Sequence, residues 1–137
     1  MGQDKRGPQG MAPAPKAQKS PACVLVVEDE ILIRVLIADE LRTEGFSVIE
    51  AATADEALSY FQAGVHVDLV LSDVQLPGAL NGVDLIQRLR AEAPGLPTVL
   101  TSGHSPGVHA ADAFLPKPYD IGQAVALVAA LLQKETR

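Results

Sequence analysis

Four short, largely apolar segments of this chain are each followed at once by polar or charged residues. The segments cover residues 23–27, 67–72, 98–101 and 113–116, and the residues at their ends are Glu28 with Asp29, Asp73, Ser102 and Lys117. Such runs are typical of strands buried on both faces of a parallel sheet. Because ligands of open α/β sheets bind at the carboxyl ends of the strands, we expect these side chains to converge. Three carboxylates, a hydroxyl and an ammonium at one edge indicate a site for a divalent cation and a phosphoryl group.

Helix-like segments separate the apolar runs, so strands and helices alternate from residue 22 onward. The predicted strands are Cys23–Val27, Ser47–Ala51, Asp68–Asp73, Pro97–Thr101 and Ala113–Leu115. The predicted helices are Glu30–Glu44, Ala54–Gln62, Gly82–Glu92 and Ile121–Gln133. Residues suited to helix ends stand at the boundaries, with Gly45 as a left-handed stop and three N-caps at Thr53, Asn81 and Asp120. Because crossovers between parallel strands are right-handed, this alternation predicts an α/β fold with a doubly wound, five-stranded parallel sheet.

The composition fits one cytosolic domain. The chain has 137 residues, of which 47% are hydrophobic, and this is enough for one sizeable core. No apolar run reaches the length of a membrane span, and the first residues lack a secretory signal. The lone Cys23 offers no disulfide and favours a reducing compartment. We therefore expect a cytoplasmic protein that does not bind a membrane.

The N-terminal segment differs from the rest of the chain. Residues 1–21 are rich in Pro, Gly, Gln, Ala and Lys, and such a segment buries too little surface to offset its ordering entropy. We expect a disordered tail over 1–21 and one domain over 22–137. The net charge is −6, although the first 22 residues hold four basic residues against one acidic residue. The domain is therefore acidic, which argues against nucleic-acid binding.

The residues around the four strand ends resemble those of two-component response regulator receiver domains. The matching segments are Val26–Glu30, Leu71–Gly78, Leu100–Gly103 and Leu115–Pro118. Asp73 stands 44 residues after Asp29 and 44 residues before Lys117, which agrees with the spacing in that family. The resemblance extends over residues 22–135 and implies a flavodoxin-like receiver fold with the strand order 2-1-3-4-5.

The resemblance assigns the chemistry of the site to individual residues. Asp73 would accept a phosphoryl group from a phosphohistidine, and Lys117 would pair with Asp73 and later with a phosphoryl oxygen. A bound Mg²⁺, for which Mn²⁺ can substitute, would offset the repulsion between carboxylate and phosphate. Its implied ligands are Asp29, Asp73 and the backbone carbonyl of Gln75, with Glu28 nearby through water.

The resemblance also implies how the domain would signal. Ser102 would donate its hydroxyl to a phosphoryl oxygen and report phosphorylation together with Phe114, and the Lys117–Pro118 bond would be cis. The protein would be a phosphoacceptor regulator rather than an enzyme, promoting its own phosphotransfer and slow self-dephosphorylation. Its expected partners are a sensor histidine kinase or phosphotransfer protein and an unknown downstream protein, reached by direct contact or phosphorelay. Because only four residues follow the last predicted helix, we expect a stand-alone receiver.

Three other classes of protein agree less well with the same residues. Haloacid-dehalogenase-like phosphatases also use an aspartate and Mg²⁺, but they carry a second aspartate where this chain has Gln75. A flavodoxin-like redox module would need a Ser/Thr/Gly-rich phosphate loop after the first strand. A receiver used only for docking would not need five chemically competent site positions. The phosphorylated switch is therefore the favoured hypothesis.

The first predicted helix is apolar on two faces. One stripe consists of Ile33, Leu36, Ile37 and Leu41, and the other of Ile31, Val35 and Ala38. Aligning Gly45 with the helix-stop glycine of the family places the first stripe in the core. The second stripe would then be exposed beside Asp29, where receivers dock the helical bundle that carries the phosphohistidine.

The segment before Lys117 is too short for the fourth helix of the family. Lys117 follows Ser102 by 15 positions, and the intervening residues include Ser105-Pro106-Gly107. Because globular helices rarely fall below about eight residues, we expect the fourth helix to be shortened or absent. In the last helix, the expected inner stripe is Ala124, Leu127, Val128 and Leu131. This leaves Val125, Ala129 and Leu132 as a candidate partner or homodimer patch, on a protein that could be a monomer or a homodimer.

Overall fold

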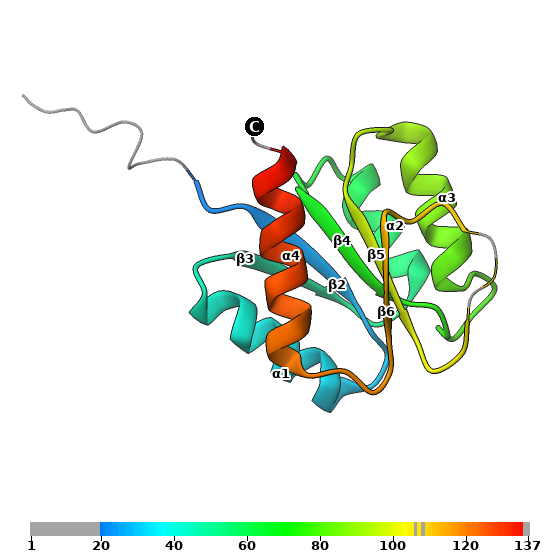
Figure 1. Ribbon diagram of the computed structural model, residues 1–137. Helices are drawn as coiled ribbons and strands as arrows, with labels where there is room; N and C mark the ends of the chain where they lie inside the picture. The colour runs from blue at the N-terminus through cyan, green and yellow to red at the C-terminus, as the bar shows by residue number, and fades with distance from the viewer. Residues whose placement is uncertain (1–19, 106, 108, 136–137) are drawn as a thin grey trace, which may run out of the picture.

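The computed structural model describes residues 20–105, 107 and 109–135, and these form a five-stranded parallel sheet covered by helices on both faces (Figure 1). The strands are β2 (Cys23–Val27), β3 (Ser47–Ala51), β4 (Leu69–Asp73), β5 (Thr98–Ser102) and β6 (Ala113–Pro116). Their order is β3-β2-β4-β5-β6, which confirms the predicted 2-1-3-4-5 arrangement. Residues 1–19, for which we expected disorder, lie outside the described part of the chain.

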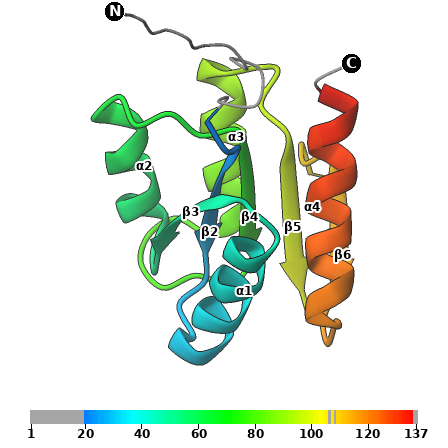
Figure 2. The same cartoon turned by 90° about the vertical axis from the view of Figure 1, so that its left-hand side faces the viewer.

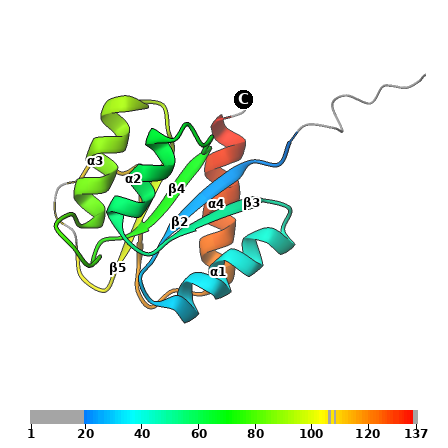
Figure 3. The same ribbon diagram turned by 180° about the vertical axis from the view of Figure 1, so that it is seen from behind.

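Helices α1 and α4 cover one face of the sheet, and α2 and α3 cover the other (Figures 2 and 3). Their bounds are α1 (Ile31–Thr43), α2 (Ala54–Gln62), α3 (Gly82–Glu92) and α4 (Ile121–Glu135). The predicted bounds of α2 and α3 are confirmed, and those of α1 and α4 differ by at most two residues at either end. Among the described residues, no helix has both the length and the apolarity needed to span a bilayer.

Strand β2 shows why the apolar runs lack a polar alternation. Its residues are all buried, and alternate side chains point to opposite faces. Val24 and Val26 pack in the core beneath α1 and α4. Leu25 and Val27 pack in the second core beneath α2 and α3. Both faces of the strand therefore need apolar side chains, and the first polar residues come where the strand ends.

The predicted helix boundaries are set by side-chain caps and one glycine. Thr53 and Asn81 each accept a hydrogen bond from the backbone N–H three residues later, at 3.0 and 2.9 Å. Asp120 Oδ1 accepts one from the N–H of Gly122 at 3.1 Å. Gly45 has a φ of +100°, a left-handed conformation that costs glycine little. These contacts satisfy backbone groups that a helix leaves unpaired at its ends.

No described residue between β5 and β6 is helical, as predicted, and residues 106 and 108 lie outside the described set. The connection is held by Asp112, whose Oδ2 accepts hydrogen bonds from Thr98 N at 2.8 Å and Arg90 Nη1 at 3.1 Å. Arg90 Nη1 also donates to the carbonyl of Ala110 at 3.1 Å. Polar contacts from β5 and α3 thus anchor the segment in place of a packed helix. Phe114 on β6 is only half-buried.

The prediction for the buried face of α1 was wrong at two positions. Leu36 was expected in the core but is 49% exposed, whereas Ala38 was expected on the surface and is buried. Ile37 and Leu41 are buried as predicted. Helix α1 packs against α4 as well as against the sheet (Figure 2). Leu36 lies beside Ile121 at the start of α4, around an open groove, so contact with α4 does not bury it. The buried stripe therefore faces the sheet.

The outer stripe predicted for α4 was also wrong. Val125 and Leu132 are buried in the same core as α1, and Ala129 is half-buried. Val125 lies with Glu40 and Phe46 around the C-terminal end of α1. Contact with α1 therefore covers most of the patch that we had considered for a homodimer.

The first residue of α3 lies directly against the end of β4. Gly82 N donates to the carbonyl of Val74 at 2.8 Å. A Cβ atom at Gly82 would collide with the carbonyl oxygen of Asp73 and lie 2.8 Å from its carbonyl carbon. Backbone atoms cannot move aside as the end of a flexible side chain can. Glycine is therefore required where α3 begins.

We predict that Gly82→Ala lowers the free energy of unfolding by about 2 kcal/mol, as expected for overpacking at a rigid site. Gly95→Ala is the matched control, because a Cβ there meets nothing within 4 Å and the change should stay within about 0.5 kcal/mol. Urea unfolding of the two variants and the wild type measures both effects. Equal stabilities of the two variants would contradict the close approach.

Candidate functional site

The parallel register brings the predicted polar residues to one edge of the sheet. Val27 on β2 is level with Ser72 on β4, and Asp73 is level with Thr101 on β5. Ser102 in turn is level with Pro116 on β6. The strands therefore end almost in step, and the residues placed at this edge are Glu28, Asp29, Asp73, Ser102 and Lys117.

Lys117 joins two of the carboxylates. Its Nζ lies 3.0 Å from Asp73 Oδ2 and 3.2 Å from Glu28 Oε1. Glu28 is 2% exposed and Asp73 is 6% exposed, so both carboxylates have lost most of their contact with water. Buried charges need partners of opposite sign, and one ammonium group serves both acids.

This arrangement changes the proton affinity of two groups. Burial raises the pKa of Glu28, the charge of Asp73 raises it further, and hydrogen bonds from Glu30 N and Lys117 offset part of the rise. For Lys117, burial alone would lower the pKa, but its hydrogen bond to Asp73 and the charges of Asp73 and Glu28 raise it overall. The lysine therefore carries its charge throughout the physiological pH range.

Three carboxylates at this edge fit a hard divalent cation. One oxygen each of Glu28, Asp29 and Asp73 lies within 4.8 Å of the others. Mg²⁺ prefers oxygen ligands and keeps several of its water ligands. Glu28 and Asp73 are buried whereas Asp29 is exposed, so one side of the cluster is open to solvent. The residues thus fit the predicted metal.

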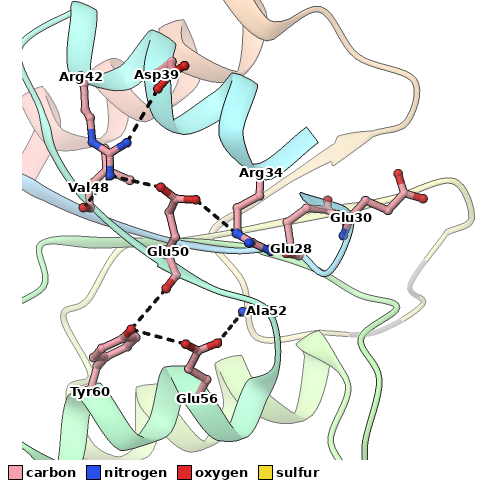
Figure 4. A network of polar contacts seen from close by, with 10 residues as sticks. All are labelled: Glu28, Glu30, Arg34, Asp39, Arg42, Val48, Glu50, Ala52, Glu56 and Tyr60. Atoms are coloured by element: carbon pink, nitrogen blue, oxygen red, sulfur yellow. Dashed lines mark hydrogen bonds and ion pairs between the residues drawn. The ribbon is translucent and has the colours of Figure 1, made fainter. Parts of the chain in front are cut away.

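Arg34 on α1 stabilises the acidic turn, residues 28–30 between β2 and α1, a role that the sequence did not indicate. Its Nη1 donates to the carbonyl of Glu28 at 2.8 Å, and its Nε donates to Glu50 Oε1 at 3.2 Å. Arg42 approaches the other oxygen of Glu50, also at 3.2 Å (Figure 4). Glu50 lies on β3, so this network ties the acidic turn to the neighbouring strand. The only signal in the sequence was a basic residue one helical turn after Glu30.

Ser102 and Gln75 are also in contact. Ser102 Oγ donates to Gln75 Oε1 at 3.2 Å and accepts from His104 N at 3.0 Å. Gln75 N donates to Asp73 Oδ1 at 3.2 Å. The sequence placed Gln75 at the site through its backbone carbonyl and did not indicate a role for its side chain. The Lys117–Pro118 bond is cis, as the resemblance implied.

An apolar groove of about 360 Å³ adjoins the acidic site. It is lined by Ile33, Leu36, Lys117, Pro118, Tyr119 and Ile121. Burial, followed by the charge of Glu28, raises the pKa of Tyr119 to about 12. Next to the groove, α1 exposes large apolar side chains, and we call this surface the α1 patch: Ile31, Leu32, Val35 and Leu36. We expected Ile31 and Val35 on this surface, but not Leu32 or Leu36.

The chain is similar in sequence to known proteins. The family model for the response regulator receiver domain matches residues 24–129. Sensor kinase CckA of Brucella abortus is 37% identical over 83% of this chain and 13% of its own length. The alkaline phosphatase synthesis transcriptional regulatory protein SphR of Synechococcus elongatus is 34% identical over 92% of this chain and 54% of its own length. The chain thus spans about half or less of these curated relatives.

A solved structure with a bound metal is also similar. Response regulator protein TrrA from Thermotoga maritima, in complex with Mg²⁺-BeF, superimposes with a TM-score of 0.73 at 30% sequence identity. The match covers 80% of this chain and 98% of that chain. The likeness therefore extends over essentially the whole sheet and its helices.

The raised pKa of Glu28 leads to a prediction on stability. A carboxyl group whose folded pKa lies above its usual 4.5 stabilises the fold below that value, and this contribution is lost as the pH rises through the folded pKa. We predict that Glu28→Gln raises the free energy of unfolding of the metal-free protein at pH 7. In this variant the free energy of unfolding should also fall less as the pH rises above 4.5. The same substitution should weaken Mg²⁺ binding.

Urea unfolding between pH 5 and pH 8 in the presence of EDTA, followed by Mg²⁺ titration, tests both effects. Asp55→Asn, at an exposed position of α2, is the control for loss of a surface carboxylate. A Glu28→Gln variant less stable than the wild type at pH 7 would contradict the destabilising burial of Glu28.

Proposed function

The chain belongs to the response regulator receiver domain family, and from this premise we propose that Asp73 is the phosphoacceptor of a two-component signalling switch. Receiver domains serve phosphorylation-dependent signalling, and the similar proteins named above include a sensor kinase and a transcriptional regulator. The observation that carries the proposal is the contact of Asp73 with Lys117 at 3.0 Å, beside two further carboxylates. Lys117 can then neutralise charge at the nucleophile.

The transfer follows from the chemistry of these groups. An oxygen of the Asp73 carboxylate attacks the phosphorus of a phosphohistidine and forms an O–P bond. The P–N bond breaks, and its electron pair returns to the imidazole nitrogen, so the product is an acyl phosphate. Lys117 and the Ser102 hydroxyl then serve as donors to phosphoryl oxygens. The Ser102 contact would pass the change to the segment before Phe114.

Asp29, Asp73 and the carbonyl of Gln75 would hold Mg²⁺, with Glu28 nearby through water, and Mn²⁺ could take its place on the same oxygen ligands. The metal would supply positive charge between the carboxylate and the phosphoryl oxygens. The oxygen cluster in this structure supports the proposal, as does the Mg²⁺-BeF complex of TrrA. Slow self-dephosphorylation, in which water takes the phosphoryl group as inorganic phosphate and the Asp73 carboxylate is restored, would return the switch to its resting state. We place the protein in the cytoplasm.

The α1 patch is the proposed docking site for the sensor histidine kinase or phosphotransfer protein. It lies on the helix that begins just after Asp29, and all four of its residues are at least 39% exposed, whereas Ala38, which we expected on this surface, is buried. The adjoining groove extends the apolar surface to Tyr119 and Lys117. A helix of the donor seated here would bring its phosphohistidine close to Asp73. Output would then pass to a downstream protein or along a phosphorelay.

We predict that acetyl phosphate labels Asp73 only when Mg²⁺ or Mn²⁺ is present. Asp73→Asn should abolish labelling because it removes the nucleophile, and Asp29→Asn should raise the Mg²⁺ concentration required. Phosphoprotein gels with and without hydroxylamine identify the acyl phosphate, which hydroxylamine cleaves. Label on the neighbouring Ser72 or on Ser102 in the wild-type protein would contradict the proposed phosphoacceptor.

A second prediction concerns docking. Val35→Glu should leave the fold and labelling by acetyl phosphate unchanged but slow transfer from the kinase about tenfold, the effect of losing about 1.4 kcal/mol of binding. Ala91→Glu places the same charge on an exposed position of α3, on the opposite face of the sheet, and serves as the control. Rates from both phosphodonors measure the difference. Equal slowing with the two donors would reject the docking role.

A further inference from the structure

Gln75 connects the phosphoacceptor strand to the predicted switch serine. Its backbone N–H donates to Asp73 Oδ1, and its side-chain Oε1 accepts the hydrogen bond of Ser102 Oγ at 3.2 Å. The Gln75 residue as a whole is exposed, whereas Ser102 is 1% exposed. The polar side chain that accepts the hydrogen bond of this buried hydroxyl thus lies at the solvent rim of the site.

The hydroxyl of Ser102 carries only one hydrogen. The backbone N–H of His104 can only donate, so Ser102 Oγ accepts that bond at 3.0 Å. The hydroxyl hydrogen then remains for Gln75 Oε1. While this bond persists, Ser102 cannot donate to a phosphoryl oxygen on Asp73. The amide oxygen and a phosphoryl oxygen would therefore compete for the same hydrogen.

We propose that the side chain of Gln75 is a latch that holds Ser102 in its unphosphorylated position. This inference rests on the proposed function and makes Gln75 a positioning residue rather than a catalytic one. Phosphorylation exchanges a neutral hydrogen bond for a stronger one to an anionic oxygen. The same movement of Ser102 Oγ disturbs its bond to His104 N and so transmits the change to the segment that replaces the fourth helix.

The latch sets how readily the phosphorylated state forms. If the side chain at position 75 has no acceptor, Ser102 is already free to donate to a phosphoryl group. Binding of that group then does not have to break the hydrogen bond between Ser102 and residue 75 first. Gln75→Met keeps the length of the side chain and removes the acceptor. Gln75→Glu keeps the length and offers a charged acceptor, which holds the hydroxyl more firmly.

The test uses beryllium fluoride as a phosphoryl analogue at saturating Mg²⁺, with affinities from isothermal titration calorimetry. Gln75→Met should bind beryllium fluoride about three- to tenfold more tightly than the wild type, the equivalent of one neutral hydrogen bond. Gln75→Glu should bind more weakly. The affinity for Mg²⁺ alone is measured for each variant, so that beryllium fluoride binding is compared at a Mg²⁺ concentration that saturates all of them.

Two Ser102 backgrounds separate the latch from a change in access to the site. With Ser102→Ala there is no hydroxyl to release, so Gln75→Met should not change the affinity for beryllium fluoride further. With Ser102→Thr a hydroxyl is present, so Gln75→Met should again raise that affinity. An equal gain in beryllium fluoride affinity in the Ser102→Ala and wild-type backgrounds, or no gain in the wild-type background, would overturn the latch but not the proposed function. Absence of beryllium fluoride binding to the wild-type protein would overturn the proposed function and the latch with it.

Discussion

One ammonium group shared between two buried carboxylates is the interaction on which this site depends. Lys117 reaches Asp73 and Glu28 at nearly equal distances, and without it two anions would face each other out of contact with water. The cost of that arrangement is visible in the raised pKa of Glu28. A cation or a phosphoryl group at this edge changes the same charge balance, so binding and chemistry are coupled to the stability of the domain.

The strands and the site could be predicted because both follow from burial. A strand covered on both faces must be apolar throughout, so the first polar residue marks its carboxyl end, and Glu28, Asp73 and Lys117 were found in this way. Parallel pairing then brings these ends together without further information. That none of the described residues between β5 and β6 is helical was equally predictable, because the residues between Ser102 and Lys117 are too few for a regular fourth helix.

Faces of helices and single hydrogen bonds were beyond the reach of the sequence. Leu36 and Ala38 exchange roles because Leu36 borders an open groove at the start of α4, and periodicity does not show where neighbouring elements leave a surface open. Val125 is buried in the core that α1 and α4 share. Arg34 and the side chain of Gln75 act through one or two bonds each, and many surface residues of the same type in a sequence make no such bonds. Tertiary contact alone distinguishes them.

The most direct measurement of the central claim is a crystal structure of the protein with Mg²⁺ and beryllium fluoride. We predict beryllium bonded to an Asp73 carboxylate oxygen, with fluorine atoms within hydrogen-bonding distance of Lys117 Nζ and Ser102 Oγ. The metal should lie among Asp29, Asp73 and the carbonyl of Gln75. Beryllium fluoride bonded to another residue, or Lys117 still paired only with the two carboxylates, would contradict it.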